Sequence, residues 1–285
     1  MEKNNYPKFI DVHSHLQFAA YDEDREEVLH HTSESNTWMI NVGTKLSTSK
    51  DAVKLAEENE GVYTIIGLHP IHTSASFHDK DEIGEEGEPF NSKGEDFSLE
   101  EFEKLIAHPK VVGVGECGLD FFRIEGDREE YIKRQVDVFE AQIDLAVKYD
   151  KPLMIHCRNA YPEVLEILQN KKQIYGDKLR GNFHFFAGNL DEAAQILDLG
   201  FNFSFTGVIT FAKQYEELVR FAPLERIFSE TDCPYVTPTP YRGQRNEPKY
   251  VSEVVRKIAE IREEDFEDVR EQLVRNAIEF FSLHP

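Results

Sequence analysis

The chain alternates short apolar runs with longer stretches in which charged residues are mixed with apolar residues at helical spacing. Short runs rich in Val, Ile and Phe predict β-strands, and the longer stretches predict α-helices. The eight predicted strands span residues 8–13, 37–42, 62–68, 111–116, 152–157, 181–186, 202–207 and 226–231. Helices are predicted at 22–35, 47–59, 98–107, 127–149, 161–172, 189–199 and 211–221, with two more near 247–260 and 263–282.

Strands that are apolar on both faces and alternate with helices are typical of a parallel sheet covered by a helix layer. Eight such strands in 285 residues predict an α/β fold of the (β/α)8 TIM-like barrel type, with parallel strands inside an outer helix layer. An open, doubly wound sheet is the alternative. No linker interrupts the pattern, so we expect a single domain over residues 1–285.

One segment, at about 78–98, breaks this alternation. It holds eight acidic residues against two lysines, together with three glycines and one proline. This composition predicts an acidic, solvated surface insertion. The simpler interpretation, a mobile loop without chemistry, is favoured because long polar loops are commonly tolerated.

Composition narrows the class of protein. A net charge of 32 − 54 = −22, with 40% hydrophobic residues, indicates a folded, soluble chain that lacks the basic surface of a duplex-binding module. No apolar run approaches the roughly 18–20 residues of a membrane span, and the first residues do not resemble a signal peptide. We therefore expect a cytoplasmic protein with no membrane partner, and we infer no obligate protein partner. Three cysteines argue against a disulfide framework.

Residues of metal-ligand type fall at the ends of five predicted strands. This is the face of a barrel where side chains from separate strands converge on an active site. Two histidines at i and i+2 of an extended segment point the same way and can bind one ion together. The six residues are His13, His15, Glu116, His156, His184 and Asp232.

Four imidazoles and two carboxylates suit zinc, manganese or a similar divalent ion, but six ligands are too many for one open tetrahedral site. They suit two ions that share a bridging carboxylate. We expect His13, His15 and Asp232 on one ion, His156 and His184 on the other, and Glu116 between the two.

For any single histidine, a structural role is the better interpretation, and the chain has 11. The coincidence of five strand ends favours the metal site. The histidines on predicted helices, loops or the terminus are assigned no role: His30, His31, His72, His78, His108 and His284. A thiol follows three of the predicted ligands directly, at Cys117, Cys157 and Cys233. Strand alternation turns these thiols toward the helix layer, so they are predicted not to be ligands.

Six segments, in order, resemble the TatD family of metal-dependent deoxyribonucleases in the amidohydrolase superfamily. They cover most of the chain, from about residue 9 to 250. Any one of them is a weak signal, but six in the right order are a strong one. The segments are DVHSHL at 11–16, GLHP at 67–70, GVGECGLD at 113–120, KPLMIHCRNA at 151–160, ETDCPY at 230–235 and YRGQRNEP at 241–248.

The resemblance implies a TIM-like barrel and a dinuclear site, holding Zn, Mg or Mn, that hydrolyses phosphodiesters in DNA. The family's ligands fall on the same six residues. Two departures concern the substrate. The family commonly has His-Cys-Phe-Ser/Thr-Gly, where this chain reads His184-Phe185-Phe186-Ala187-Gly188 and so lacks a small polar residue beside the site. The acidic insertion is the second departure, because it follows the third strand and lies on the rim of the site.

Asp232 is the predicted general base, because a carboxylate that binds metal through one oxygen can deprotonate water with the other. A role as ligand alone is held equally. Two divalent ions and two carboxylates leave a positive pocket centre inside an acidic shell. This favours single-stranded or short oligonucleotides, cleaved from an end, over long duplexes.

Phosphate needs donors, and Arg158, Arg242 and Arg245 are the candidates because guanidinium groups bind phosphate bidentately. Salt bridges to the abundant acids are the alternative for each. His69 ends the third strand and either contacts substrate, acts as an acid or holds the turn.

Two other functions remain open. The first is another amidohydrolase-type reaction, such as opening a lactone, a cyclic amide or a small phosphoester. The fourth strand offers Glu116 rather than the carboxylated lysine frequent in such enzymes, which favours the nuclease. The second is a metal-binding protein without catalysis, against which the complete set of ligands and base argues.

Overall fold

The structure is a computed structural model that describes residues 6–74, 76–78, 90–92, 94–122, 124 and 127–284. Within these residues, eight strands form one sheet in the order β1-β2-β3-β6-β7-β8-β9-β10, and all paired neighbours run parallel. The strands are β1 (Phe9–Ser14), β2 (Thr37–Val42), β3 (Val62–Ile66), β6 (Val111–Asp120), β7 (Leu153–Arg158), β8 (Gly181–Phe183), β9 (Asn202–Phe205) and β10 (Ile227–Ser229).

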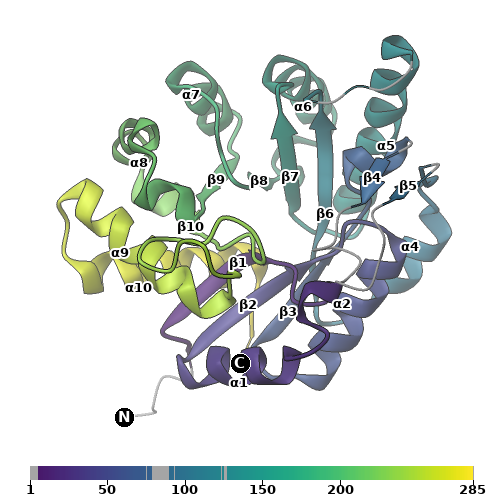
Figure 1. Ribbon diagram of the computed structural model, residues 1–285. Coiled ribbons are helices and arrows are strands. Elements are labelled where there is room, and N and C mark those ends of the chain that lie inside the picture. Colours follow the sequence, from purple (N-terminus) through teal and green to yellow (C-terminus); the bar gives the residue numbers. More distant parts are fainter. Residues whose placement is uncertain are drawn as a thin grey trace.

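Helices lie outside the strands (Figure 1). They are α1 (Arg25–Glu34), α2 (Leu46–Glu58), α4 (Leu99–Ile106), α5 (Arg128–Lys148), α6 (Tyr161–Tyr175), α7 (Leu190–Asp198), α8 (Glu216–Phe221), α9 (Val251–Arg262) and α10 (Phe266–Phe281). The expected (β/α)8 barrel is confirmed. No helix of the described ranges is long and apolar enough to cross a membrane.

The barrel closes between its first and last strands just beyond β10. Ser14 and Cys233 form a parallel bridge. The Asp232 N–H donates to the His13 carbonyl at 2.9 Å, and the His15 N–H donates to the Cys233 carbonyl at 2.9 Å. Closure therefore places the segment after β10 directly beside the predicted ligands of β1.

The strands and helices pack through a continuous apolar interface. Phe139 and Ile143 of α5 share one buried cluster with Val111 and Val114 of β6. Burying such side chains contributes about 1.5–3 kcal/mol each, which fixes the strand ends in place. The site on the barrel face thus stands on rigid elements.

Two strands depart from regular pairing at the predicted ligands. The register of β1 against β2 shifts between Asp11 and Ser14, around His13. The register of β6 against β7 shifts between Val114 and Cys117, around Glu116. Bulges of this kind re-aim a side chain and frequently lie beside active sites.

The fourth barrel strand is longer than predicted. It ends at Asp120 rather than at 116 because pairing with β7 resumes after the bulge, up to Asp120 opposite Arg158. Gly118 permits this pairing, since its φ is +137° and a Cβ there would lie 2.0 Å from the His156 carbonyl oxygen.

The predicted acidic insertion is only partly described. Strands β4 (Ser76–His78) and β5 (Phe90–Ser92) pair antiparallel at its edges. Residues 90–92 thus form a strand inside a segment that we expected to be a loop. The remainder of the segment, at 79–89 and 93, lies outside the described residues.

Candidate metal centre

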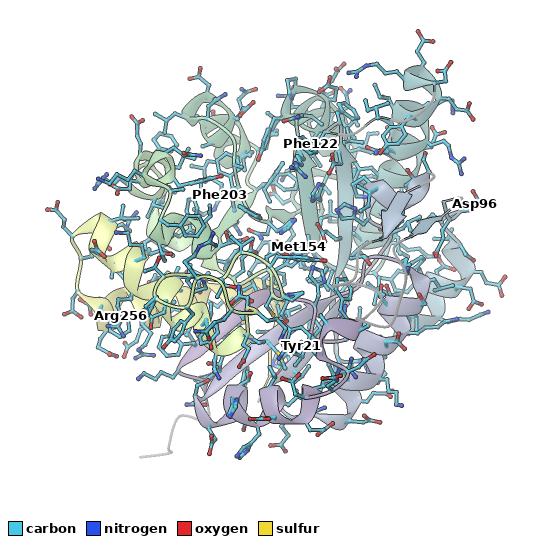
Figure 2. All side chains as sticks on the ribbon, viewed as in Figure 1. Tyr21, Asp96, Phe122, Met154, Phe203 and Arg256 are labelled. Carbon is cyan, nitrogen blue, oxygen red and sulfur yellow. The ribbon has the colours of Figure 1, made fainter. Side chains whose placement is uncertain are left out.

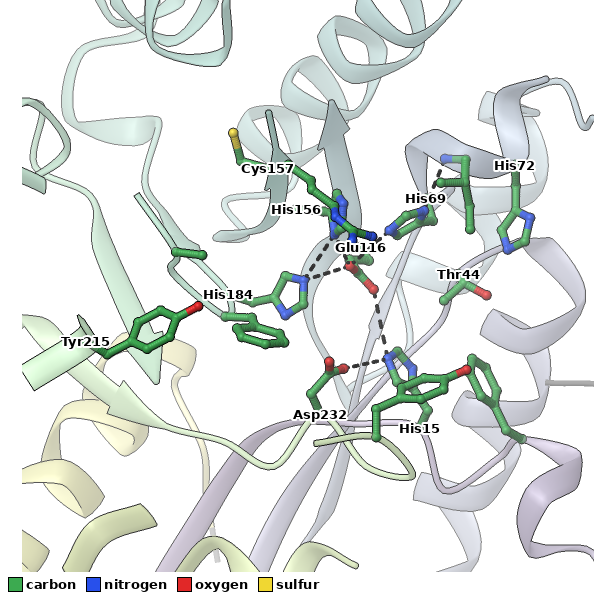
Figure 3. A pocket seen from close by; sticks show the side chains of 16 residues that line it. His15, Thr44, His69, His72, Glu116, His156, Cys157, His184, Tyr215 and Asp232 are labelled. Carbon is green, nitrogen blue, oxygen red and sulfur yellow. Dashed lines mark hydrogen bonds and ion pairs between the residues drawn. The ribbon is translucent and has the colours of Figure 1, made fainter. Parts of the chain in front are cut away.

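The six predicted ligands lie together at the carboxyl ends of the strands. Five of them line a pocket of about 450 Å³, and His13 is fully buried beside it. Figure 3 shows these five converging from separate strands: His15, Glu116, His156, His184 and Asp232.

The first half of the cluster consists of His13 on β1, His15 directly after it, and Asp232 in the segment after β10. The His13 and His15 Nε2 atoms lie 3.1 Å apart. Asp232 Oδ1 lies 3.7 Å from His13 Nε2 and 3.5 Å from His15 Nε2. Asp232 has a φ of +54°, a left-handed conformation that Asp adopts more readily than most residues and that is common at functional sites.

The second half consists of His156 and His184, from β7 and the end of β8. His156 Nδ1 and His184 Nε2 lie 3.3 Å apart. The ring of His184 also stacks on that of His13, with centroids 4.0 Å apart, so the two halves are in contact.

Glu116 lies between the halves with one oxygen toward each. Its Oε2 lies 3.5 Å from His13 Nε2 and 3.9 Å from His15 Nε2. Its Oε1 lies 2.9 Å from His156 Nδ1 and 2.8 Å from His184 Nε2. This is the arrangement that a carboxylate shared by two cations requires.

The outer hydrogen bonds of two histidines turn a lone pair toward the cluster. His15 Nδ1 lies 2.7 Å from the Val42 carbonyl oxygen, which only accepts, so Nε2 carries the lone pair. His156 Nε2 lies 2.9 Å from Asp120 Oδ2, so His156 Nδ1 carries the lone pair. In the neutral ring that lone pair faces Glu116 Oε1, and the two groups repel unless a proton or a metal ion lies between them. The donors therefore fit divalent metal ions.

Sequence reasoning assigned no role to Asp120, the carboxylate behind His156. Asp120 is buried, and its second oxygen accepts from the Phe122 N–H at 2.8 Å. The signal was available, because Asp120 lies four residues after Glu116 in the sequence GECGLD. It was missed because the strand was expected to end at Glu116.

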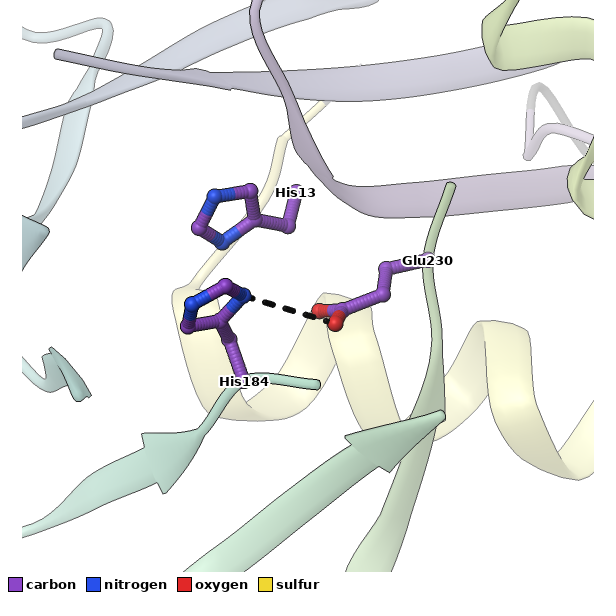
Figure 4. Close-up of side chains that lie close together, drawn as sticks. All are labelled: His13, His184 and Glu230. Atoms are coloured by element: carbon purple, nitrogen blue, oxygen red, sulfur yellow. Dashed lines mark ion pairs between the residues drawn. The ribbon is translucent and has the colours of Figure 1, made fainter. Parts of the chain in front are cut away.

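Glu230, behind His184, was also missed (Figure 4). This fully buried carboxylate lies 3.6 Å from His184 Nδ1 and accepts from the Ser204 hydroxyl and the Phe185 N–H, both at 2.6 Å. It also belongs to a group, with His13 and His184, whose ligand atoms are close enough to hold a cation. Its place two residues before Asp232 was the available signal.

Burial and charge shift the pKa values in opposite directions. Burial raises the pKa of Glu116, but the surrounding histidines outweigh it and hold the pKa well below its usual range. Burial lowers the pKa of His184, yet Glu116 and Glu230 leave it well above 6.5. Burial and the neighbouring His184 lower the pKa of His13. Glu116 is thus an anion at neutral pH, as a metal-bridging carboxylate must be.

His69 joins the cluster from the third-strand side. Its Nε2 lies 3.2 Å from Glu116 Oε1, and its Nδ1 accepts from the Ile71 N–H at 3.1 Å. The side chain holds the turn through this hydrogen bond and also lines the pocket, so a role toward substrate stays a prediction. His72, which was assigned no role, also lines the pocket.

The three candidate phosphate donors lie in different settings. Arg158 lines the pocket and is exposed. Arg242 is exposed on the loop after β10 and donates to the Thr237 carbonyl. Arg245 forms a two-pronged ion pair with Asp24, at 2.9 and 2.6 Å. Arg245 therefore has the salt bridge that was the alternative to phosphate binding.

The cysteines take up positions outside the ligand set. Cys117 and Cys233 are buried in apolar clusters, and burial raises the pKa of both thiols, to about 12 for Cys233. Cys157 is partly exposed at the pocket wall, with its sulfur turned away from the histidines in Figure 3. None of the three is among the groups able to hold a cation in the described part of the chain.

Comparison with known families identifies the chain. The profile of the TatD related DNase family matches residues 10–282. The chain belongs to this family. The resemblance seen in the six sequence segments is thereby confirmed.

Individual TatD relatives align over nearly their whole length. The chain is 35% identical to the uncharacterized metal-dependent hydrolase YabD of Bacillus subtilis, over 96% of this chain and 99% of that protein. It is 33% identical to the uncharacterized metal-dependent hydrolase TatD of Mycobacterium tuberculosis, over 88% and 89%. The crystal structure of the TatD homolog YjjV of Escherichia coli matches with a TM-score of 0.82 and 26% identity, over 97% and 99%.

Proposed function

We propose that the protein is a divalent-metal-dependent hydrolase that cleaves phosphodiester bonds in DNA, from an end and on single-stranded or short substrates. The observation that carries this proposal is the position of Glu116, with one carboxylate oxygen toward each half of the histidine cluster. Membership of the TatD related DNase family supports the same reaction.

The ligands in this proposal are the six residues described above, with Glu116 shared between two ions of Zn, Mg or Mn. Bound divalent ions would lower the pKa of a water and stabilise the charge that develops on the phosphate and the leaving oxygen. The hydrogen bonds of His15 to the Val42 carbonyl and of His156 to Asp120 fix the ring orientations, so the inner nitrogens already face the cluster where a metal ion would replace a proton.

Asp232 is the proposed general base. Its Oδ1 faces the first-half histidines, and its side chain lines the pocket, so the carboxylate is within reach of a water there. Burial raises the Asp232 pKa, but hydrogen bonding and charge from the histidines hold it below its usual value. The carboxylate is therefore ionised at neutral pH and ready to accept a proton.

A second candidate is hydrolysis of a lactone, a cyclic amide or a small phosphoester. Aromatic side chains favour it, because Phe18, Phe185, Tyr215 and Tyr235 line the pocket and offer an apolar wall to a small neutral substrate. Turnover of such esters with none on DNA would place this candidate first.

The test uses chelator-treated protein and a short, end-labelled single-stranded DNA, with Mg²⁺, Mn²⁺ or Zn²⁺ restored in turn. We expect stepwise shortening of the DNA with at least one metal, and none in a Glu116→Gln variant that keeps the side-chain shape. A panel of lactones and phosphoesters serves as the comparison. The absence of DNA cleavage with every metal would overturn the proposal.

A further inference from the structure

Arg158 is held on an aromatic ring at the mouth of the metal pocket. Its guanidinium carbon lies 3.5 Å from the centroid of the Phe122 ring. Phe122 is 47% exposed although it is a large apolar side chain. Figure 2 labels it beside the carboxyl ends of β6 and β7. Its backbone N–H bonds to Asp120, which in turn bonds to His156, so the stack is tied to the metal cluster.

A second stack of the same composition lies on the same face of the barrel. The Arg242 guanidinium carbon lies 3.9 Å from the centroid of the Phe211 ring, which is 44% exposed. Phe211 follows β9 and Arg242 follows β10. The two segments are joined by the Thr239 N–H, which donates to the Thr210 hydroxyl at 2.9 Å.

Within the described residues, neither guanidinium has an acidic partner, although the chain carries a net charge of −22. No carboxylate of the described residues lies within 4 Å of Arg158 or Arg242, whereas Arg180 and Arg245 pair with Asp150 and Asp24. A guanidinium stacked on phenylalanine keeps its second face open to another flat ring and its edge N–H groups open to an anion. In Arg242 one of these groups, Nη1, already donates to the Thr237 carbonyl, so the other N–H groups would meet the anion. A flat ring joined to an anion is the chemistry of a nucleotide.

We propose that the Arg158–Phe122 and Arg242–Phe211 stacks are two nucleotide-binding positions for a single strand that enters the metal pocket. At each position an unpaired base would stack on the guanidinium, and the adjoining phosphate would accept from its N–H edge. The inference rests on the proposed function. It adds the residues that bind the nucleotides on either side of the phosphodiester bond that is cleaved.

Two consequences follow from stacking. Every base has an aromatic face, so these positions would bind all four bases with little preference. A duplex would bind poorly, because its bases already stack on one another and do not present their faces. The stacks would therefore select single strands over duplexes. The negative net charge of the protein cannot make this distinction, because it only discourages long polyanions of either kind.

The test compares Phe122→Leu, Arg158→Lys and Phe211→Leu with wild type. Leucine keeps an apolar side chain without the ring, and lysine keeps the charge without the plane. Phe221→Leu is the matched control, because Phe221 is equally exposed at 44% but lies on α8. The substrates are a single-stranded pentanucleotide, the same strand with one abasic residue at each position in turn, and bis(4-nitrophenyl) phosphate.

We expect the KM for the pentanucleotide to rise about tenfold in each of the three variants, with kcat within about twofold. Hydrolysis of bis(4-nitrophenyl) phosphate by Phe122→Leu and Phe211→Leu should stay at the wild-type level, and so should all values for Phe221→Leu. One abasic position should raise the KM of wild type by a similar factor and leave that of Phe122→Leu unchanged. Independent effects of the abasic residue and the variant would overturn the inference.

A binding measurement separates failure of this inference from failure of the proposed function. Chelator-treated protein is mixed with a pentanucleotide that carries 2-aminopurine, whose fluorescence falls on stacking. Quenching that is lost in Phe122→Leu and Arg158→Lys supports the stacks even if no DNA is hydrolysed. Cleavage of the pentanucleotide with unchanged KM and unchanged quenching in the variants would remove the stacks and leave the nuclease proposal intact.

Discussion

The two halves of the histidine cluster are held by different kinds of partner. In the first half, His15 bonds to the Val42 carbonyl, and His13 Nδ1 has no hydrogen-bond partner among the described residues. In the second half, Asp120 hydrogen-bonds the outer nitrogen of His156. Glu230 lies 3.6 Å from His184 Nδ1, where its charge acts on the ring although this nitrogen, like His13 Nδ1, has no hydrogen bond within the described residues. A carboxylate behind a histidine raises its basicity as a ligand. We therefore expect the second half to bind a cation more tightly than the first.

The pKa values of the histidines also differ between the two halves, and they follow the distribution of carboxylate partners. In the second half the pKa values of both histidines are raised, because hydrogen bonds and charge from carboxylates outweigh burial. In the first half the pKa of His15 is raised by Asp232 against burial, but that of His13 is lowered. Tighter binding in the second half thus comes with stronger competition from protons.

The largest effect should come from removing what the halves share. In Glu116→Gln an amide replaces the oxygen charges that face both sets of histidines. We expect metal content to fall in both halves and turnover to fall by at least about 10²–10³-fold, the scale of losing one preorganised charge partner. Elemental analysis after gel filtration, alongside the DNA assay, measures both quantities. Full metal content with retained turnover would refute the shared-carboxylate arrangement.

Asp120→Asn should weaken one half only. The neutral amide of Asn would accept the His156 Nε2–H more weakly than the Asp120 carboxylate does, which makes the imidazole a less basic ligand. Metal affinity in the second half should therefore fall by about 10–100-fold. Chelator competition should show one weakened ion and one unchanged. The matched control is Asp144→Asn, an exposed acid on α5 that pairs with Lys171. Equal weakening of both ions would remove the distinction between the halves.

The pH dependence of metal binding sharpens the comparison further. A metal ion must displace the proton of His184, so affinity in the second half should fall about tenfold per pH unit just below the His184 pKa, which lies well above 6.5. The fall should steepen at lower pH, where His156, whose pKa is also raised, carries a proton too. In Glu230→Gln the anion that helps to raise this pKa is lost. We expect the pH above which metal affinity no longer rises to move to a lower value in this variant. The affinity on that plateau should also fall.

Chelator competition at several pH values in Co²⁺-substituted protein measures this dependence, with the visible absorption of the ion as the readout. An unchanged levelling-off in Glu230→Gln would show that Glu230 does not act on His184.

The barrel and the six clustered residues could be predicted because both follow from local pattern. Apolar runs specify strands, and the ends of parallel strands meet on one face whatever the loops do. The partners behind the ligands could not be predicted in the same way. Asp120 lies beyond a bulge that a strict period of two cannot anticipate, and Glu230 follows the last paired residue of β10.

Arginine roles were the least predictable, since sequence gives the charge but not its partner. Arg245 and Arg242 stand three residues apart in one loop. Both guanidiniums lie over a ring, Arg245 over Tyr21 and Arg242 over Phe211. Arg245 also pairs with Asp24, whereas Arg242 has no acidic partner among the described residues. Only the approach of distant segments decides between these outcomes.

The smallest effect concerns how the first half is supported without carboxylates behind its histidines. Arg245 donates to the Ala20 carbonyl and to Asp24, and the Tyr21 hydroxyl donates to the Asn246 carbonyl at 2.6 Å. These contacts hold the segments after β1 and β10 against each other. Because Arg245 and Asp24 are about one-third exposed, Arg245→Ala should lower the free energy of unfolding by no more than about 1 kcal/mol.

The same variant should loosen the first half only, since the second half is built on β6, β7 and β8. We expect the metal affinity of the first half to fall by less than the Asp120→Asn effect, with the second half unchanged. Urea unfolding and chelator competition measure the two effects. A loss of affinity in the second half would mean that loop packing, and not the carboxylates, holds the whole cluster together.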